Sequence, residues 1–162
     1  MSTIECSSNT TLSEQEVRAA ITDFSSGRPD RWPNLDPTMY KVHELDRTWA
    51  DVTEGSRFAG GIWERARYEW DDPHRVVLTV TDSNAFAPGS SWEYETAPLG
   101  DEGTRVDLVV NRQGRNVKGR FLAAVLRISG RKVFCGDLAK TLRMLEVESR
   151  NNSEGLSESP AS

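Results

Sequence analysis

The segment WERARYEW, residues 63–70, carries groups capable of acid–base chemistry at alternating positions. Successive side chains of a strand point to opposite faces, so Glu64, Ala66, Tyr68 and Trp70 share one face, while two arginines share the other. We predict that the Glu64 face points inward, because burying two unpaired guanidinium groups costs more than burying one protonatable carboxyl. A carboxyl in an apolar pocket has a raised pKa and could act as a general acid or base. A solvated Glu64 is the alternative.

Tyrosines and tryptophans recur along the chain and suit the wall of an apolar cavity. Their large rings bury well, and a hydroxyl or indole N–H at the tip can orient a bound molecule. Ordinary core packing is the alternative for each of them. The candidates for a catalytic role are Glu64, Tyr68 and Tyr94. The residues expected to contact a ligand are Trp32, Ala66, Tyr68, Trp70, Leu78, Phe86, Trp92, Tyr94, Leu108, Phe121 and Val125.

Metal and nucleotide chemistry find no support in the motifs. His43 and His74 lie far apart, and neither belongs to an H-x-x-x-H or C-x-x-C pattern. The chain also lacks a P-loop, a dinucleotide fingerprint and a G-x-S-x-G element. We therefore predict no metal site and no cofactor.

The charge balance argues against nucleic-acid binding. The net charge is −5 and the isoelectric point is about 5.1, whereas a nucleic-acid-binding domain normally has a basic footprint. Residues 108–136 nevertheless hold seven Lys and Arg side chains and no acid. Such a patch could hold an anionic head group or carrier near Arg112, Arg115, Lys118 and Arg120. A solvated helix face is the alternative.

The chain reads as a cytoplasmic protein. It has no run of roughly 18 apolar residues that could span a membrane, and its first residues lack the basic and apolar regions of a secretory signal. We expect its two cysteines, Cys6 and Cys135, to be reduced and packed. A monomer and a homodimer are both compatible with the sequence.

The N-terminal part predicts a strand at 3–8 and two helices. Ser13 and Glu16 form a capping box that opens a helix ending near Phe24. A short second helix is expected at 30–35, where flanking prolines would hold Trp32 at a fixed angle near a cavity mouth or a sheet edge.

The middle of the chain predicts a sheet. Six short segments rich in β-branched and aromatic residues are separated by turn residues, and no helix fits between them, which indicates an antiparallel meander. The six segments are 40–45, 47–53, 62–70, 75–82, 91–98 and 104–112.

A long helix is predicted at 117–148, followed by a disordered tail at 149–162, so that residues 1–148 form a single domain. Its apolar stripe would cover the sheet, with a bend near Gly130 and Gly136. The residues expected in this stripe are Phe121, Val125, Ile128, Lys132, Cys135, Leu138, Leu142 and Leu145.

This order of elements, with RWPNLDP after the first helix and WDDPHRVVL between two strands, resembles the START-related superfamily (SRPBCC) of polyketide cyclases and dehydrases, lipid-transfer proteins and birch-pollen-type allergens. The resemblance covers about residues 3–148. It implies an α+β helix-grip fold, in which a curved seven-stranded antiparallel sheet wraps a long C-terminal helix, with two short helices after the first strand. It also implies a cavity between sheet and helix that accepts a lipid, polyketide or aromatic metabolite. The alternatives are a polyketide cyclase, aromatase or dehydratase, and an interaction module without a ligand.

Overall fold

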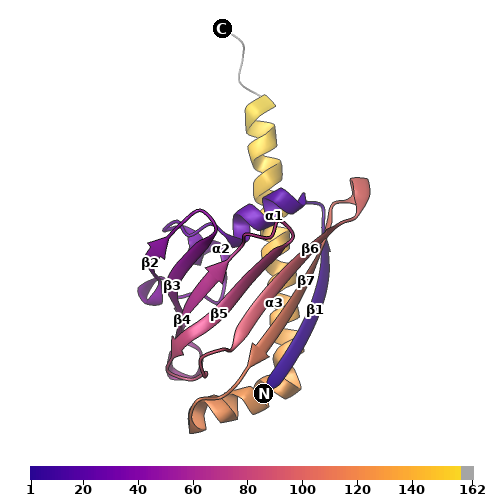
Figure 1. The fold of residues 1–162 in the computed structure, drawn as a ribbon. Coiled ribbons are helices and arrows are strands. Elements are labelled where there is room, and N and C mark those ends of the chain that lie inside the picture. Colours follow the sequence, from indigo (N-terminus) through magenta and orange to yellow (C-terminus); the bar gives the residue numbers. More distant parts are fainter. Residues whose placement is uncertain (158–162) are drawn as a thin grey trace.

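The computed structural model describes residues 1–157, which fold as one antiparallel sheet and a long helix. The strands lie in the order β1-β7-β6-β5-β4-β3-β2. In Figure 1 the sheet curves around the C-terminal helix, and the two short helices lie near one end of the sheet. The predicted helix-grip architecture and meander are confirmed. The elements are β1 (Ser2–Thr10), α1 (Glu14–Ile21), α2 (Arg28–Arg31), η1 (Pro37–Met39), β2 (Lys41–Leu45), β3 (Trp49–Ser56), η2 (Phe58–Gly60), β4 (Ile62–Glu69), β5 (Arg75–Ser83), β6 (Ser91–Pro98), η3 (Gly100–Glu102), β7 (Thr104–Arg112) and α3 (Val117–Ser157).

Helix α1 begins at the predicted capping box. The Ser13 hydroxyl accepts from the Glu16 N–H at 3.3 Å, and the Glu16 carboxylate accepts from the Ser13 N–H at 2.8 Å. These two bonds satisfy backbone donors that the first turn of a helix leaves free. Val17 and Ile21 on the inner side of α1 are buried in the core.

Helix α2 is placed earlier than predicted, at Arg28–Arg31 instead of 30–35. Trp32 already has an extended backbone, with φ −107° and ψ 100°. The residue before a proline avoids the helical region because the proline ring would clash with it, so Pro33 ends the helix ahead of Trp32. The helix therefore presents Arg28 from its first turn and Trp32 from its end.

The inner face of the sheet forms the core together with α3. Along β7 the side chains of Val106, Leu108 and Val110 alternate with more exposed neighbours, as their sequence pattern predicts. On β4 the buried residues are Ala66 and Tyr68, with Trp70 buried just after the strand, so the predicted register of this segment is confirmed. Arg65 lies on the outer face and pairs with Asp51.

The face of α3 that meets the sheet differs from the prediction in its first half. Phe121 is 67% exposed and Ile128 is 89% exposed, so the predicted stripe is wrong there. The buried stripe begins instead at Leu122 and continues through Phe134. Gly130 also lies on the inner side, where a Cβ atom would come within 2.5 Å of the Ile4 side chain, so the glycine permits close packing of α3 on β1.

Helix α3 is longer than predicted. Residues 149–157 of the predicted disordered tail are helical, and residues 158–162 lie outside the described part of the chain. Two contacts with the short helices lie where this extension begins. The Ser149 hydroxyl donates to Glu16 of α1 at 2.7 Å, and Arg31 of α2 pairs with Glu148 at 2.9 Å.

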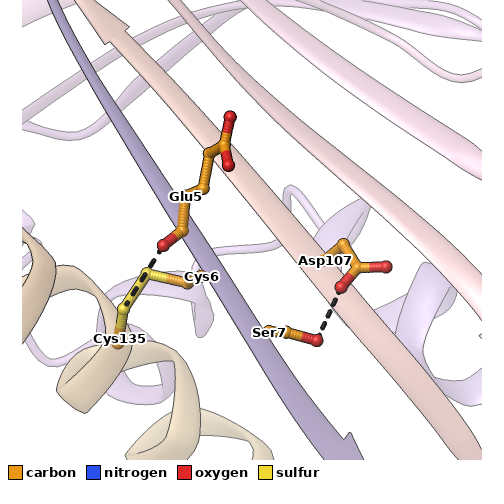
Figure 2. Close-up of a disulfide and its surroundings, with 5 residues drawn as sticks. All are labelled: Glu5, Cys6, Ser7, Asp107 and Cys135. Carbon is orange, nitrogen blue, oxygen red and sulfur yellow. Dashed lines mark hydrogen bonds between the residues drawn. A yellow bond between two sulfur atoms is a disulfide. The ribbon is translucent and has the colours of Figure 1, made fainter.

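Strand β1 is tied to α3 by a disulfide between Cys6 and Cys135, shown in Figure 2. The prediction of two reduced thiols is therefore wrong. The pairing arises because β1 runs along α3 and brings the two Cα atoms to 5.3 Å although 129 residues separate them in sequence. Hydrogen bonds lie on both sides of the disulfide: Ser2 donates to a backbone carbonyl of α3, and Thr10 donates to a glutamate of α3. None of the helices in the described part of the chain is long and apolar enough to cross a membrane.

Candidate ligand-binding cavity

Two glutamates lie opposite one another on the inner face of the sheet. Glu54 of β3 and Glu64 of β4 are direct partners in the β3–β4 register. Like charges at opposed positions destabilise a sheet unless each is compensated. Two buried arginines from different parts of the fold, Arg28 and Arg112, provide this compensation.

Arg28 of α2 neutralises Glu54. Its Nε donates to Glu54 Oε1 at 2.6 Å, its Nη1 donates to the Ile21 carbonyl at 2.7 Å, and its Nη2 donates to the Tyr68 hydroxyl at 3.2 Å. The Tyr68 hydroxyl in turn donates to Glu54 Oε2 at 2.6 Å. The guanidinium also lies over the rings of Phe24, Trp32 and Tyr68, at 4.6 to 5.3 Å from their centroids. The segment RPDRWP therefore positions a buried cation together with an aromatic ring that covers it.

These contacts shift the pKa values of Arg28 and Tyr68. Burial alone would lower the pKa of Arg28, but Glu54 and Tyr68 together more than offset it, so the pKa of Arg28 lies above its ordinary value. Burial, reinforced by Glu54, raises the pKa of Tyr68 well above its usual range. Tyr68 therefore stays protonated and holds Glu54 as an acceptor.

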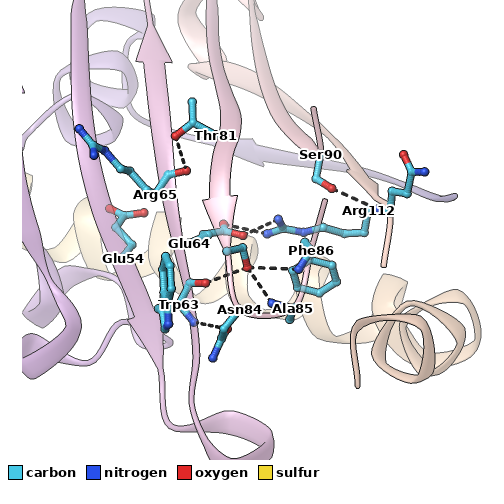
Figure 3. Close-up of polar contacts among 12 residues, drawn as sticks. Glu54, Trp63, Glu64, Arg65, Thr81, Asn84, Ala85, Phe86, Ser90 and Arg112 are labelled. Atoms are coloured by element: carbon cyan, nitrogen blue, oxygen red, sulfur yellow. Dashed lines mark hydrogen bonds and ion pairs between the residues drawn. The ribbon is translucent and has the colours of Figure 1, made fainter. Parts of the chain in front are cut away.

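Arg112 at the end of β7 neutralises Glu64. Its Nη1 and Nη2 donate to the two carboxylate oxygens of Glu64 at 2.6 and 3.0 Å, a two-pronged pair that Figure 3 shows. The guanidinium is stacked near the rings of Phe86 and Trp92, at 4.6 and 4.8 Å. Only 4% of the Arg112 side chain and 13% of the Glu64 side chain are exposed.

The loop after β5 holds Phe86 against Arg112. The Ser83 hydroxyl donates to the Trp63 carbonyl at 2.8 Å and accepts from the N–H groups of Ala85 and Phe86 at 3.1 and 3.2 Å. The start of α3 packs directly on this loop because Gly119 has no side chain. A Cβ atom at Gly119 would lie 1.7 Å from the Ala85 carbonyl oxygen.

These groups line a cavity of about 770 Å³ between the sheet, α3 and the segment that follows α2. Drug-sized ligands occupy pockets of about 300–1,000 Å³ with mostly apolar walls and few polar groups. The apolar part of the wall combines sheet residues with one side of α3: Ile62, Leu78, Phe86, Trp92, Leu122, Val125, Leu126, Val133 and Phe134. Trp32 lies edge-on to Tyr94, with the ring centroids 6.3 Å apart.

Most residues singled out from the sequence meet at this cavity. Its lining includes Trp32, Glu64, Tyr68, Leu78, Phe86, Trp92, Tyr94 and Val125. Ala66 and Leu108 are buried in the core outside the lining, and Trp70 stacks on Phe24 at 5.6 Å instead. Phe121 points away from the cavity, as its exposure shows, because the inner side of α3 is shifted by one residue at this point.

Sequence reasoning missed Arg28 and Glu54, and it placed Arg112 on the surface. The signals for two of them were present. Glu54 follows Ala50 and Val52 at alternate positions of a strand, and Arg112 follows Val110 in the same way, so the period of two already places both residues on the inner face. No sequence pattern marks Arg28 as buried, because it lies in a single short turn of helix that is too short to show an apolar periodicity.

The predicted basic patch is smaller than its sequence suggests. Arg112 is buried and paired inside the fold. Arg115 forms an ion pair with Asp82 at 2.5 Å, and Lys118 donates to the Gly61 carbonyl at 2.9 Å, so these cations have partners. Arg120 is exposed. Within the described residues no group of three or more His, Cys, Asp and Glu side chains is placed to hold a metal ion.

Comparison with known proteins finds similarity in structure alone. No protein-family model and no curated protein matches the sequence. The Zhui aromatase/cyclase from Streptomyces sp. R1128 superposes with a TM-score of 0.72 at 16% identity, over 89% of this chain and 93% of that one. A START superfamily protein from Mycobacterium smegmatis gives 0.68 at 12% identity, over 92% and 97% of the two chains. The protein TTHA0849 from Thermus thermophilus gives 0.70 at 16% identity, over 93% and 99%.

This chain therefore shares its fold with these proteins, one of which is described as a START superfamily protein. Its cavity lies between the sheet and α3, as expected for a helix-grip fold in which one helix is too narrow to cover the concave face of seven strands.

Proposed function

We propose that this protein binds a hydrophobic small molecule, such as a lipid, a polyketide or an aromatic metabolite, in the cavity between the sheet and α3. The volume of about 770 Å³ carries the proposal, since a space of this size is large enough for a molecule of several rings or a folded chain. The aromatic wall supports it, because burial of apolar surface would drive binding. The same space argues against an interaction module that fills its interior with its own aromatic side chains.

Binding is tested by displacement and by blocking the cavity. The neutral dye N-phenyl-1-naphthylamine should bind to the wild-type protein with increased fluorescence. Val125→Trp adds bulk on the cavity side of α3 and should weaken dye binding at least about tenfold. Ile128→Trp introduces the same side chain three residues further on, at a position that is 89% exposed, and should leave binding unchanged. Equal binding by both variants would contradict the proposal. Native mass spectrometry of protein purified from its own host is the complementary measurement, because a copurified molecule would identify the class of ligand.

A second candidate is a cyclase, aromatase or dehydratase that uses the same cavity. It is favoured by the presence of protonatable groups within the lining, Glu64 and Tyr94, and by structural similarity to proteins described as aromatase/cyclases. Conversion of a linear poly-β-ketone into a cyclised product, with loss of conversion but retention of dye binding in Tyr94→Phe, would support it. Binding of such a substrate without conversion would leave the binding function as the better description.

A further inference from the structure

The first half of helix α3 carries an apolar row that the fold leaves unburied. Leu122 and Ala123 are buried on the inner side of the helix. On the other side, Val117, Phe121 and Ile128 are 84%, 67% and 89% exposed. These three follow one another at four and seven residues, the spacing that places side chains on one side of a helix. None of them belongs to a hydrophobic cluster of the described residues, so the row has no partner in that part of the fold.

Cations lie on both flanks of this apolar row. Arg120, Arg127 and Arg131 follow one another at seven and four residues, so they run along one flank, and Lys132 lies on the other. All four are exposed, and none of their side chains forms an ion pair or hydrogen bond within the residues that the structure describes. The two rows together form the outer face of α3, which consists of Val117, Arg120, Phe121, Arg127, Ile128, Arg131 and Lys132.

The outer face differs in charge from the molecule as a whole. The net charge of the chain is −5, yet residues 108–136 contain no acid. The other cations of this range, Arg112, Arg115 and Lys118, already bind acceptors within the protein. The four cations of the outer face therefore remain available to an external anion, and the uneven charge distribution turns this face toward an anionic surface.

Free cations beside protruding apolar side chains match the surface of an anionic membrane. Arginine and lysine attract anionic head groups, while apolar side chains on the same helix enter the boundary between head groups and acyl chains. A soluble polyanion such as a nucleic acid would satisfy the cations but would leave most of the apolar row in water. We propose that the outer face of α3 docks the protein on anionic lipid membranes, with its arginines on lipid phosphates and with Phe121 and Ile128 in the interfacial layer.

The outer face adjoins an exposed part of the cavity wall. Ser129 and Val133 line the cavity and are exposed, and each directly follows a residue of the outer face. Lys118 donates to the Gly61 carbonyl at 2.9 Å, which joins the start of α3 to the turn that carries the exposed Phe58, another lining residue. In Figure 1 this start of α3, in orange, lies at the end of the sheet away from α1. Docking would therefore hold the exposed part of the lining close to the lipid.

Co-sedimentation of the purified protein with lipid vesicles tests the proposal. Vesicles of phosphatidylcholine with about 30% phosphatidylglycerol should bind the protein, and vesicles of phosphatidylcholine alone should bind it at least about tenfold more weakly. Binding to the anionic vesicles should fall as the salt concentration rises from about 0.1 M to about 0.5 M, because added ions screen the cations.

Two variants assign the binding to the outer face. Arg120→Gln/Arg127→Gln/Arg131→Gln should weaken binding to the anionic vesicles at least about thirtyfold, because each cation near such a surface strengthens binding about fivefold. Phe121→Ser/Ile128→Ser keeps the charge and should weaken binding about tenfold, because the apolar side chains no longer enter the interface.

Matched controls make the same changes elsewhere on the surface. Lys41→Gln/Arg47→Gln/Arg143→Gln lowers the net charge by the same amount, and Leu45→Ser/Met144→Ser removes two other exposed apolar side chains. Both controls should bind the vesicles within about twofold of the wild type, because charges away from the contact are screened. Every substituted residue is exposed, so all four variants should keep the fold, which circular dichroism checks.

The outcomes decide between a membrane and other partners. Absence of binding to anionic vesicles, or equal binding to neutral ones, overturns the proposal. It is also overturned if Phe121→Ser/Ile128→Ser binds as tightly as the wild type, since charge alone then drives binding and a nucleic acid or an acidic protein would fit the face equally well. The vesicle measurements need no molecule in the cavity, so their failure leaves the proposed binding function untouched, and the reverse also holds.

Discussion

Glu54 and Glu64 are directly opposed on β3 and β4, and each is neutralised by its own buried arginine. The two arginines come from α2 and from the end of β7, so the carboxylates connect three separate parts of the fold at the cavity wall. Removal of any one of the four charges leaves a buried charge without a partner.

The Arg112–Glu64 pair should therefore show strong coupling. Arg112→Met should lower the free energy of unfolding by about 3–5 kcal/mol, because Glu64 remains buried and unpaired. The double variant Arg112→Met/Glu64→Leu should recover most of this loss, since both charges are then absent. Urea denaturation of the three proteins measures the coupling. As a control, Arg115→Met breaks a pair whose side chains are more than half exposed and should cost under about 1 kcal/mol. A double variant no more stable than the single one would show that the pair is not coupled.

Reduction should destabilise the protein. The Cys6–Cys135 disulfide closes a loop with a sequence separation of 129, and its loss should cost about 2–5 kcal/mol by increasing the freedom of the unfolded chain. Thermal unfolding with and without dithiothreitol measures this. The double variant Cys6→Ala/Cys135→Ala should not respond to the reductant. Its melting temperature should be close to that of the reduced wild type, with or without dithiothreitol. A wild-type melting temperature that is unchanged by full reduction would count against a stabilising role.

Two glycines of α3 should respond in opposite directions to alanine. Gly119→Ala places a methyl group against the Ala85 carbonyl. Because a shift of the backbone is costly, we expect the free energy of unfolding to fall by about 1–3 kcal/mol. Gly136→Ala adds a methyl group with no atom within 4 Å and should stabilise the helix by about 0.5–1 kcal/mol. Urea midpoints compare the two. Equal effects of the two changes would contradict the close contact at Gly119.

Asp137 should make stability depend on pH. Burial raises the pKa of this carboxyl above its ordinary value of 3.8, so the folded state favours its protonated form. The stabilisation that comes from protonation of Asp137 in the folded state is fully present below the unfolded pKa, and it is lost as the pH rises through the higher folded pKa. Asp137→Asn should therefore gain stability relative to wild type across that window and keep a constant advantage above it. Urea unfolding over a pH series measures the difference, with the exposed Asp101→Asn as control. If the advantage of Asp137→Asn shrinks as the pH rises, the pKa of Asp137 is lowered on folding and not raised.

The sheet was predictable from the sequence because the alternation of apolar and polar residues along a strand shows which of its faces is buried. Val106, Leu108 and Val110 fix the inner face of β7 by alternation, and Glu64, Tyr68 and Trp70 do the same for β4. The two-residue period leaves only two choices, and the cost of burying arginine selects one.

The helix face and the long-range pairs were not predictable in this way. The first half of α3 carries apolar residues on two sides, and spacing alone cannot say that Leu122 rather than Phe121 meets the sheet. The arginine partners of Glu54 and Glu64 lie 26 and 48 residues away in sequence. The disulfide spans a larger separation still, so only the three-dimensional fold shows these contacts.

The covalent link between β1 and α3 lies at one edge of the sheet, because β1 is the first strand in the order and β2 is the last. The segment after α2 and the turn at Phe58, which border the cavity, adjoin β3 and β4 near the opposite edge. Helix α3 is thus held covalently at one edge of the sheet and only by noncovalent contacts, such as the bond from Lys118 to the Gly61 carbonyl, beside the cavity. Widening the cavity on that side would break noncovalent contacts alone.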